Sequence, residues 1–281
     1  MGVEVALSTR NVHTKNFMWT TNFNFAYNNN KVLKEALRED ALEPGREGYP
    51  AGALFALKTA GLDEEGYPMF QDKDGKAVSA MEFFKLQEWG FGATDLTARE
   101  RRELYTYVGT ADCPYTGGFN NTFTYKAFEL GVNFSFDFGG KVRSQPTYSI
   151  VDFDKGRNTN RDILNSWTPE NTETIFPVLL SQNERLDEYM WYSNQNEIYR
   201  NLDIWIRDLN YVRLQNIRLG YTLPTNFSRT LGMTSATVAI EGRNLLVFGS
   251  SYKNYLDPET MSNAYATPAP KSVTLSLNLI F

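Results

Sequence analysis

The 281-residue sequence predicts an all-β fold of about seven antiparallel strands, joined by turns and loops of very different length. Three observations predict it. Aromatic residues make up 14% of the chain, and many alternate with Asn, Thr and Ser, a composition typical of strands. Several segments carry apolar residues at every second position over about ten residues. The mean hydropathy is -0.43, and no apolar run approaches the ~20 residues that a membrane helix needs.

The clearest predicted strand is the last one, residues 272–281. Its polar residues fall on one face and its apolar residues on the other, except for Ile280. The apolar face holds Val273, Leu275, Leu277, Leu279 and Phe281. A soluble β-sandwich strand could carry the same alternation. The aromatic carboxyl end instead resembles the assembly signal of outer-membrane barrels, and we assign these five residues to such a signal.

Six further strands are predicted upstream, most of them with one apolar and one polar face. They cover residues 3–9, 17–27, 117–125, 128–138, 203–223 and 234–247. In 128–138, phenylalanines share one face, whereas Glu129 and Asp137 lie on the other. A barrel would turn the first face to lipid and the second to its water-filled lumen.

The segment 203–223 changes phase part-way. The apolar residues Val212 and Leu214 have even numbers, whereas Ile217 and Leu219 have odd numbers. In a regular strand the two pairs would therefore point to opposite faces. We therefore predict a β-bulge near Gln215 and Asn216. The alternative is that the first half of this strand projects above the membrane.

The predicted connections alternate strictly between short and long. The short ones are 10–16, 126–127 and 224–233, and the long ones are 29–116, 145–202 and 248–270. Outer-membrane barrels have short periplasmic turns and long extracellular loops. The alternation therefore predicts three extracellular loops and a periplasmic carboxyl end. Within the first long loop, residues 80–89 are predicted to form a short helix.

Seven strands do not close a barrel, because an open edge would expose unsatisfied backbone groups to hydrocarbon. We therefore expect further strands from sequence outside this chain. Met1 is followed by no secretion signal, so the exporting signal is also expected upstream.

Charge and single residues exclude several function classes. The formal net charge is -5 and the Lys and Arg residues are scattered, which argues against nucleic-acid binding. Cys113 is the only cysteine, so no internal disulfide forms. His13 is the only histidine and lies in a predicted periplasmic turn, where neither a catalytic triad nor a zinc cluster can be built around it. We predict no enzyme activity and no catalytic residue.

The long loops contain weaker site candidates. Residues 72–75 and 152–156 superficially resemble calcium loops but lack the glycine and the closing glutamate, so solvated turns are favoured. We predict no cofactor, with a loosely bound surface Ca²⁺ as the open alternative. Trp167, Trp191 and Tyr192 could stack on sugar rings, although packing of the loops or an interfacial girdle explains them better.

Several motifs, in order along almost the whole chain, resemble those of SusC/RagA-type TonB-linked outer-membrane proteins of Bacteroidetes. They are Gly2-Val3-Glu4-Val5, Gly117 to Phe123, Trp167-Thr168-Pro169, Tyr211 to Pro224, Gly242 to Leu246 and Asp257-Pro258-Glu259. Ala127 stands where the family usually has glycine, and Glu170-Asn171 replace its Gly-Asp. The last motif is assigned to fixing the turn of the final loop.

The resemblance implies that the chain is the C-terminal part of a plugged outer-membrane β-barrel of about 22 strands. It further implies a multi-pass protein of the Gram-negative outer membrane that belongs to a TonB-dependent active importer. A SusD-like lipoprotein would present an oligosaccharide or peptide, and TonB would act through the missing N-terminal part. No plug, TonB box or signal peptide is expected in residues 1–281. The alternative is a surface or secreted β-protein that binds glycans without transporting them.

Overall fold

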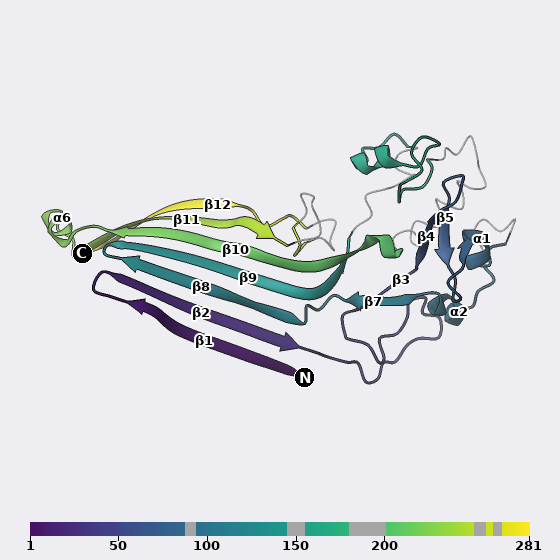
Figure 1. Cartoon of the computed structure of the whole chain (residues 1–281), viewed down its shortest axis with the longest axis horizontal. Helices are drawn as coiled ribbons and strands as arrows, with labels where there is room; N and C mark the ends of the chain where they lie inside the picture. Colours follow the sequence, from purple (N-terminus) through teal and green to yellow (C-terminus); the bar gives the residue numbers. More distant parts are fainter. Residues whose placement is uncertain (88–93, 145–154, 180–200, 250–256, 261–265) are drawn as a thin grey trace.

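The computed structural model describes residues 1–87, 94–144, 155–179, 201–249, 257–260 and 266–281. A long, curved, seven-stranded sheet dominates the molecule, and a small module of loops lies beyond one end of it (Figure 1). The strand order is β1-β2-β8-β9-β10-β11-β12, and every neighbouring pair is antiparallel.

All seven strands predicted from the sequence are confirmed. They are β1 (Gly2–His13), β2 (Phe17–Asn28), β8 (Tyr115–Tyr125), β9 (Phe128–Arg143), β10 (Ile206–Thr222), β11 (Ser235–Phe248) and β12 (Ser272–Ile280). Three predicted boundaries are wrong, the first being the end of β9, which continues to Arg143 instead of ending at 138. His13 pairs with Met18 at the end of β1, so the following turn shrinks to residues 14–16. Asp203–Trp205 forms a 3-10 helix instead of the start of β10.

The predicted β-bulge in β10 is also confirmed. The register against both β9 and β11 shifts between Leu214 and Asn216. Leu214 pairs with Phe134 and Ile217 pairs with Val132, two residues of the same β9 face. The bulge therefore brings both halves of the phase-shifted segment onto one face.

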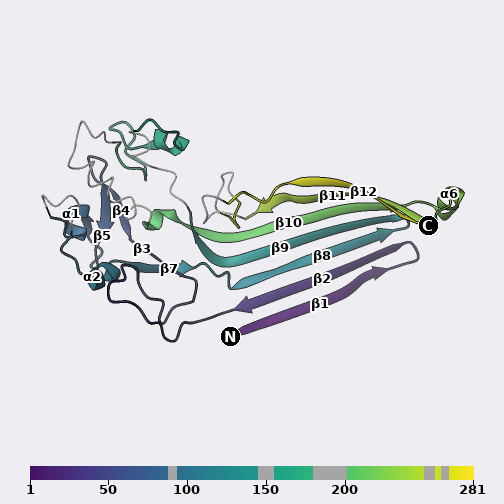
Figure 2. The same cartoon turned by 180° about the vertical axis from the view of Figure 1, so that it is seen from behind.

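Short turns and long connections lie at opposite ends of the sheet (Figures 1 and 2). The short end carries residues 14–16, residues 126–127 and the helix α6 (Thr225–Thr230), and the carboxyl terminus lies there too. The long connections leave from the other end. The predicted alternation of short and long connections is thus confirmed.

The loop module contains small elements of its own. They are β3 (Ala53–Ala56) paired with β7 (Thr106–Thr110), a sheet of β4 (Thr59–Leu62), β5 (Pro68–Gln71) and β6 (Ala77–Ser79), and the helices α1 (Ala80–Phe83) and α2 (Ala98–Glu103). The helix predicted over 80–89 is too long, because Lys85 adopts a left-handed φ of 46° after α1 ends. At α2, Thr97 and Glu100 form a capping box, and their hydrogen bonds lower the pKa of the Glu100 carboxyl.

The main buried apolar cluster lies in this module. Phe70, Val78 and Phe83 of the connection 29–114 pack with Leu202 and Trp205 of the connection 144–205. The two connections therefore share one hydrophobic core. No helix in the described part of the chain is long and apolar enough to cross a bilayer.

The seven-stranded sheet is a single layer with two different faces. On one face the register aligns apolar side chains across every strand, as in the row Val12, Trp19, Phe123, Leu130, Leu219, Ile240 and Leu275. Rings stack along this face, with centroids 5.6 Å apart for Trp19 and Phe123. The opposite face carries rows such as Ser8, Asn22, Asn120, Asn133, Asn216, Arg243 and Ser272. We call these the apolar face and the polar face.

Candidate functional site

Charged side chains of the polar face gather on β9, β10 and β11. Glu129 and Arg218 lie 3.2 Å apart, and Glu241 and Arg243 lie 2.5 Å apart. At least one side chain of each pair is exposed, so each pair contributes ~1 kcal/mol or less.

Arg213 is different, because only 2% of it is exposed. The bulge in β10 keeps Arg213 on the polar face, where the last connection folds over it. Its Nη2 forms an ion pair with the Asp257 carboxylate, and its Nε lies 3.0 Å from Oε1 of Glu259. A segment of the final loop is thereby tied to the wall of the sheet.

Tyr211 lies on the same face, two residues before Arg213. Its hydroxyl is 2.5 Å from Oδ2 of Asp137 and 3.1 Å from Oε1 of Glu259. The Asp257 carboxylate also accepts the backbone N–H of Glu259 at 3.0 Å and of Ala269 at 3.4 Å. We call Asp137, Tyr211, Arg213, Asp257 and Glu259 the loop anchor.

The loop anchor is suited to holding the loop and not to catalysis. Its arginine binds two carboxylates at once, a geometry that fixes position. The sequence analysis assigned Asp257-Pro258-Glu259 to the turn of the final loop, and the structure adds the partners on β9 and β10. Arg213 and Leu214 are adjacent in a strand, so their side chains point to opposite faces. This alternation is the feature of the sequence from which the polar-face position of Arg213 could have been predicted.

The other predicted site residues lie apart from the loop anchor. The indole of Trp167 rests on the β4–β5 turn, where a Cβ added to Gly66 would lie 2.6 Å from the ring. Its backbone N–H donates to the carbonyl of Phe176 at 3.0 Å. Trp167 therefore packs the loop module. Trp191 and Tyr192 lie outside the described residues.

The acidic segment 72–75 forms the tight β5–β6 turn. One carboxylate oxygen of Asp72 accepts the backbone N–H groups of Asp74 at 2.9 Å and Lys76 at 2.8 Å. Residues 152–154 of the second segment lie outside the described part. Among the described residues, no group of three or more His, Cys, Asp and Glu side chains is arranged to hold a metal ion. A surface Ca²⁺ stays a prediction.

The two residues with the most reactive side-chain types have no catalytic surroundings. His13 is exposed at the end of β1. Burial raises the pKa of the Cys113 thiol, which makes it a poor nucleophile at neutral pH.

Of the five carboxyl-terminal residues assigned to an assembly signal, the four within β12 lie on the apolar face. Leu275 pairs with Ile240 and Leu277 with Val238, both on the apolar face of β11. Leu275 is 76% exposed and Phe281, just after β12, is 82% exposed. Their role in assembly stays a prediction.

The fold and sequence match known receptors over the whole chain. No protein-family model matches. TonB-dependent receptor P3 of Formosa agariphila is 26% identical over 308 residues, which cover 100% of this chain and 28% of that receptor. TonB-dependent receptor SusC of Bacteroides thetaiotaomicron is 22% identical over 300 residues, which cover 99% of this chain and 26% of that receptor. The RagAB peptide importer in its "open-open" state matches 100% of this chain with a TM-score of 0.69 and 20% identity. The chain is a relative of the SusC/RagA-type TonB-dependent receptors.

The chain matches the C-terminal portion of the barrel in RagAB, of which it covers 28%. It therefore spans only about a quarter of the length of the TonB-dependent receptors that it resembles. The names of these relatives describe receptors and an importer, none of them an enzyme.

Proposed function

We propose that the chain is part of the barrel wall of a TonB-dependent importer in the cell outer membrane. The observation that carries this proposal is the single-layer sheet with one apolar and one polar face. In water the apolar face would expose large side chains such as Leu275 and Leu277, at 76% and 62%. In a barrel wall it contacts hydrocarbon, and the polar face lines a water-filled lumen.

Strand length supports the same arrangement. A tilted strand crosses a bilayer with about 9–11 residues. β9 has 16 residues and β10 has 17, so both extend beyond the membrane at the end that carries the loop module. The loop module then lies outside the cell, where a SusD-like lipoprotein would meet it.

The cargo is proposed to be an oligosaccharide or a peptide. SusC and RagAB, to which the chain is similar, are named a TonB-dependent receptor and a peptide importer. TonB would act on the part of the receptor that precedes these residues. A secreted glycan-binding β-protein is the second candidate, supported by the aromatic residues of the loops. The exposed apolar face disfavours it, because such a large patch is unfavourable in water.

The test uses the full-length receptor in its own outer membrane. We expect detergent-extracted protein to migrate faster on a gel before boiling than after it. We also expect deletion of the gene to abolish growth on one class of glycan or peptide. A monomeric protein that is soluble without detergent would contradict the barrel, and unchanged growth on every substrate would contradict import.

A further inference from the structure

We propose that the short end of the sheet binds an anionic phospholipid on the side of the wall that faces the membrane. The site combines the exposed cations of the three short connections, Lys15, Lys126 and Arg229, with aromatic side chains beside them on the apolar face. We call it the phospholipid rim. The inference rests on the proposed barrel wall and names the lipid that would meet its periplasmic end.

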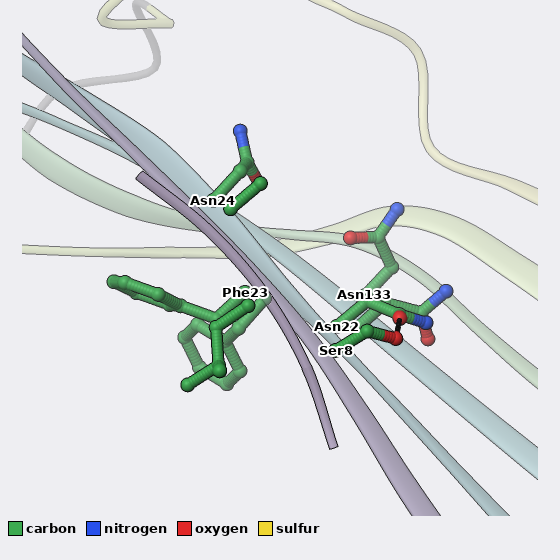
Figure 3. A pocket seen from close by; sticks show the side chains of 9 residues that line it. Ser8, Asn22, Phe23, Asn24 and Asn133 are labelled. Carbon is green, nitrogen blue, oxygen red and sulfur yellow. Dashed lines mark hydrogen bonds between the residues drawn. The ribbon is translucent and has the colours of Figure 1, made fainter. Parts of the chain in front are cut away.

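A row of aromatic side chains borders the short connections on the apolar face. Phe17 pairs with Tyr125, which pairs in turn with Phe128. Phe128 also pairs with Tyr221, and the centroids of these two rings are 4.6 Å apart. Phe17 lies on the same face of β2 as Phe23, which points away from the asparagines that line a hollow of the polar face (Figure 3). Aromatic residues collect where a membrane meets water, so this row marks the interface at the short end.

Lys126 places a cation on the lipid side of this row. Its Nζ lies 5.4 Å from the centroid of the Tyr125 ring, a cation–π contact. Because Tyr125 is an exposed residue of the apolar face, the ammonium group lies beside lipid and not in the lumen. The nearest acidic residue along the chain is Glu129, which lies on the polar face and pairs there with Arg218. The charge of Lys126 is therefore available to a phosphate group.

The three short connections share one sign of charge. Each has a single Lys or Arg and no Asp or Glu. Lys15, Lys126 and Arg229 are exposed, and none of them forms an ion pair within the described part of the chain. The first two connections adjoin, since the Lys126 N–H donates to the carbonyl of Asn16 at 2.9 Å. At the opposite end of the sheet, acidic residues outnumber basic ones in the connection 29–114. The short end is therefore the basic end.

The helix α6 adds apolar groups to the phospholipid rim. Phe227 and Leu231 lie about one helical turn apart, and both are exposed. Arg229 lies between them in the sequence. Exposed apolar side chains are unfavourable in water, whereas at a bilayer surface they enter the acyl boundary while a neighbouring cation meets the phosphates. The composition of α6 therefore suits contact with lipid.

Charge decides which lipid fits the rim. Each Lys or Arg close to an anionic membrane surface strengthens binding about fivefold. A phosphatidylglycerol headgroup carries a net negative charge, whereas the quaternary ammonium of phosphatidylcholine offsets its phosphate. The rim should therefore prefer phosphatidylglycerol. The position of the Lys126 ammonium group beside a lipid-facing ring favours a lipid over an acidic protein as the occupant.

The test measures lipid binding to the full-length receptor in a neutral detergent. The probes are dioleoyl phosphatidylglycerol and dioleoyl phosphatidylcholine, and native mass spectrometry counts the lipids bound at each concentration. The triple variant replaces Lys15, Lys126 and Arg229 with Gln. Two single variants, Lys126→Gln and Lys126→Arg, separate loss of charge from change of side chain. Gel migration without boiling measures the folded barrel in parallel.

The matched control removes the same charge at the other end of the sheet. It replaces Lys34, Lys73 and Lys76 with Gln, three exposed lysines of the loop module. A second control adds glycerol 3-phosphate in excess. This ion carries the phosphate without acyl chains, so it distinguishes binding of a lipid from binding of a free phosphate.

We expect the native receptor to bind phosphatidylglycerol several times more tightly than phosphatidylcholine. The triple variant should weaken phosphatidylglycerol binding about fivefold or more, while phosphatidylcholine binding and the loop-module control stay unchanged. Lys126→Gln should weaken it about threefold or more, and Lys126→Arg should bind as the native receptor does. Equal binding of the two lipids by the native receptor would overturn the inference and leave the barrel intact.

An equal loss in the loop-module control would also overturn the inference, and so would full competition by glycerol 3-phosphate. If the triple variant does not fold, the two single variants decide, and equal binding by Lys126→Gln and Lys126→Arg overturns the inference. A native receptor that does not migrate as a folded barrel before boiling would count against the proposed barrel wall itself.

Discussion

At the scale of single residues, Arg213 shows how one buried cation joins a loop to a wall. It is almost fully enclosed, with Asp257 and Glu259 on the loop side. Tyr211 joins the same group through Glu259 and Asp137. Enclosing a guanidinium is favourable only when carboxylates accompany it. The motif at 257–259 and the arginine on β10 therefore depend on each other.

Replacing Arg213 with Met tests this dependence. We expect the full-length receptor to lose ~3–5 kcal/mol of stability, because the buried Asp257 carboxylate would lack a cation. Adding Asp257→Asn and Glu259→Gln should restore much of the loss. The measurement is the temperature at which the extracted protein stops migrating as a folded barrel. Arg243→Met is the control, since the Arg243 side chain is exposed and its pair with Glu241 should contribute under ~1 kcal/mol. Equal effects of the two substitutions would contradict a special role for Arg213.

Two strand glycines differ in the space around them. A Cβ on Gly117 would lie 2.3 Å from the carbonyl oxygen of Asn24 and 2.7 Å from the Phe136 ring, whereas Gly131 has open space. We therefore expect Gly117→Ala to destabilise the barrel by ~1–3 kcal/mol through overpacking. Gly131→Ala should stay within ~0.5 kcal/mol or stabilise slightly, because alanine loses less backbone entropy than glycine. Urea unfolding of the refolded receptor in detergent measures both, and a larger loss at Gly131 would refute the packing argument.

At the scale of elements, β10 is the strand that most constrains the sheet. Its bulge keeps Val212 and Leu214 on the apolar face together with Ile217 and Leu219. The same bulge leaves Tyr211 and Arg213 on the polar face, where the loop anchor forms. Without the extra residue, one half of the strand would face the wrong side.

Deleting Gln215 should therefore be far worse than changing it. The deletion turns Arg213 or the residues after the bulge to the opposite face, and a charged side chain facing hydrocarbon costs ~2–4 kcal/mol near the bilayer centre. We expect little or no folded receptor on gels run without boiling. Gln215→Ala keeps the spacing and loses a 2.7 Å hydrogen bond to Ser135, for a cost of ~1 kcal/mol. A deletion variant that folds as well as Gln215→Ala would show that the bulge is not needed.

The elements that could be predicted are those with a regular side-chain period. Side-chain alternation and strand-typical composition located the seven long strands, and the parity change located the bulge. The short strands of the loop module gave no such signal, because β6 spans only three residues. The loop anchor could not be predicted either. Its members come from β9, β10 and a loop, and only the fold brings Asp137 to Tyr211 and Asp257 to Arg213.

At the scale of the whole molecule, the two faces of the sheet indicate which side of the proposed barrel wall faces the lumen and which faces lipid. Leu275 and Thr274 are neighbours in β12 that lie on opposite faces, where they pair with Ile240 and Glu241. Leu275 also belongs to the five residues assigned to the assembly signal. The two positions thus differ in the surroundings that a barrel would give them.

Lysine at these two positions tests the orientation. We expect Leu275→Lys to lower the stability of the full-length receptor in lipid vesicles by up to ~2–4 kcal/mol, because the ammonium group would face hydrocarbon. Thr274→Lys should have little effect, because it faces water in the lumen. Thermal unfolding in vesicles measures both variants. Equal sensitivity at the two positions would mean that β12 has no lipid-facing side.

The shared hydrophobic core of the loop module limits how such a receptor can be redesigned. Its hydrophobic core takes Phe70 and Val78 from one connection and Leu202 and Trp205 from the other. Leu57 also bonds across to the second connection, through Asn201 and Asp203. Transplanting either connection alone would leave half of that core facing water. Residues 29–114 and 144–205 should therefore be exchanged between receptors as a pair.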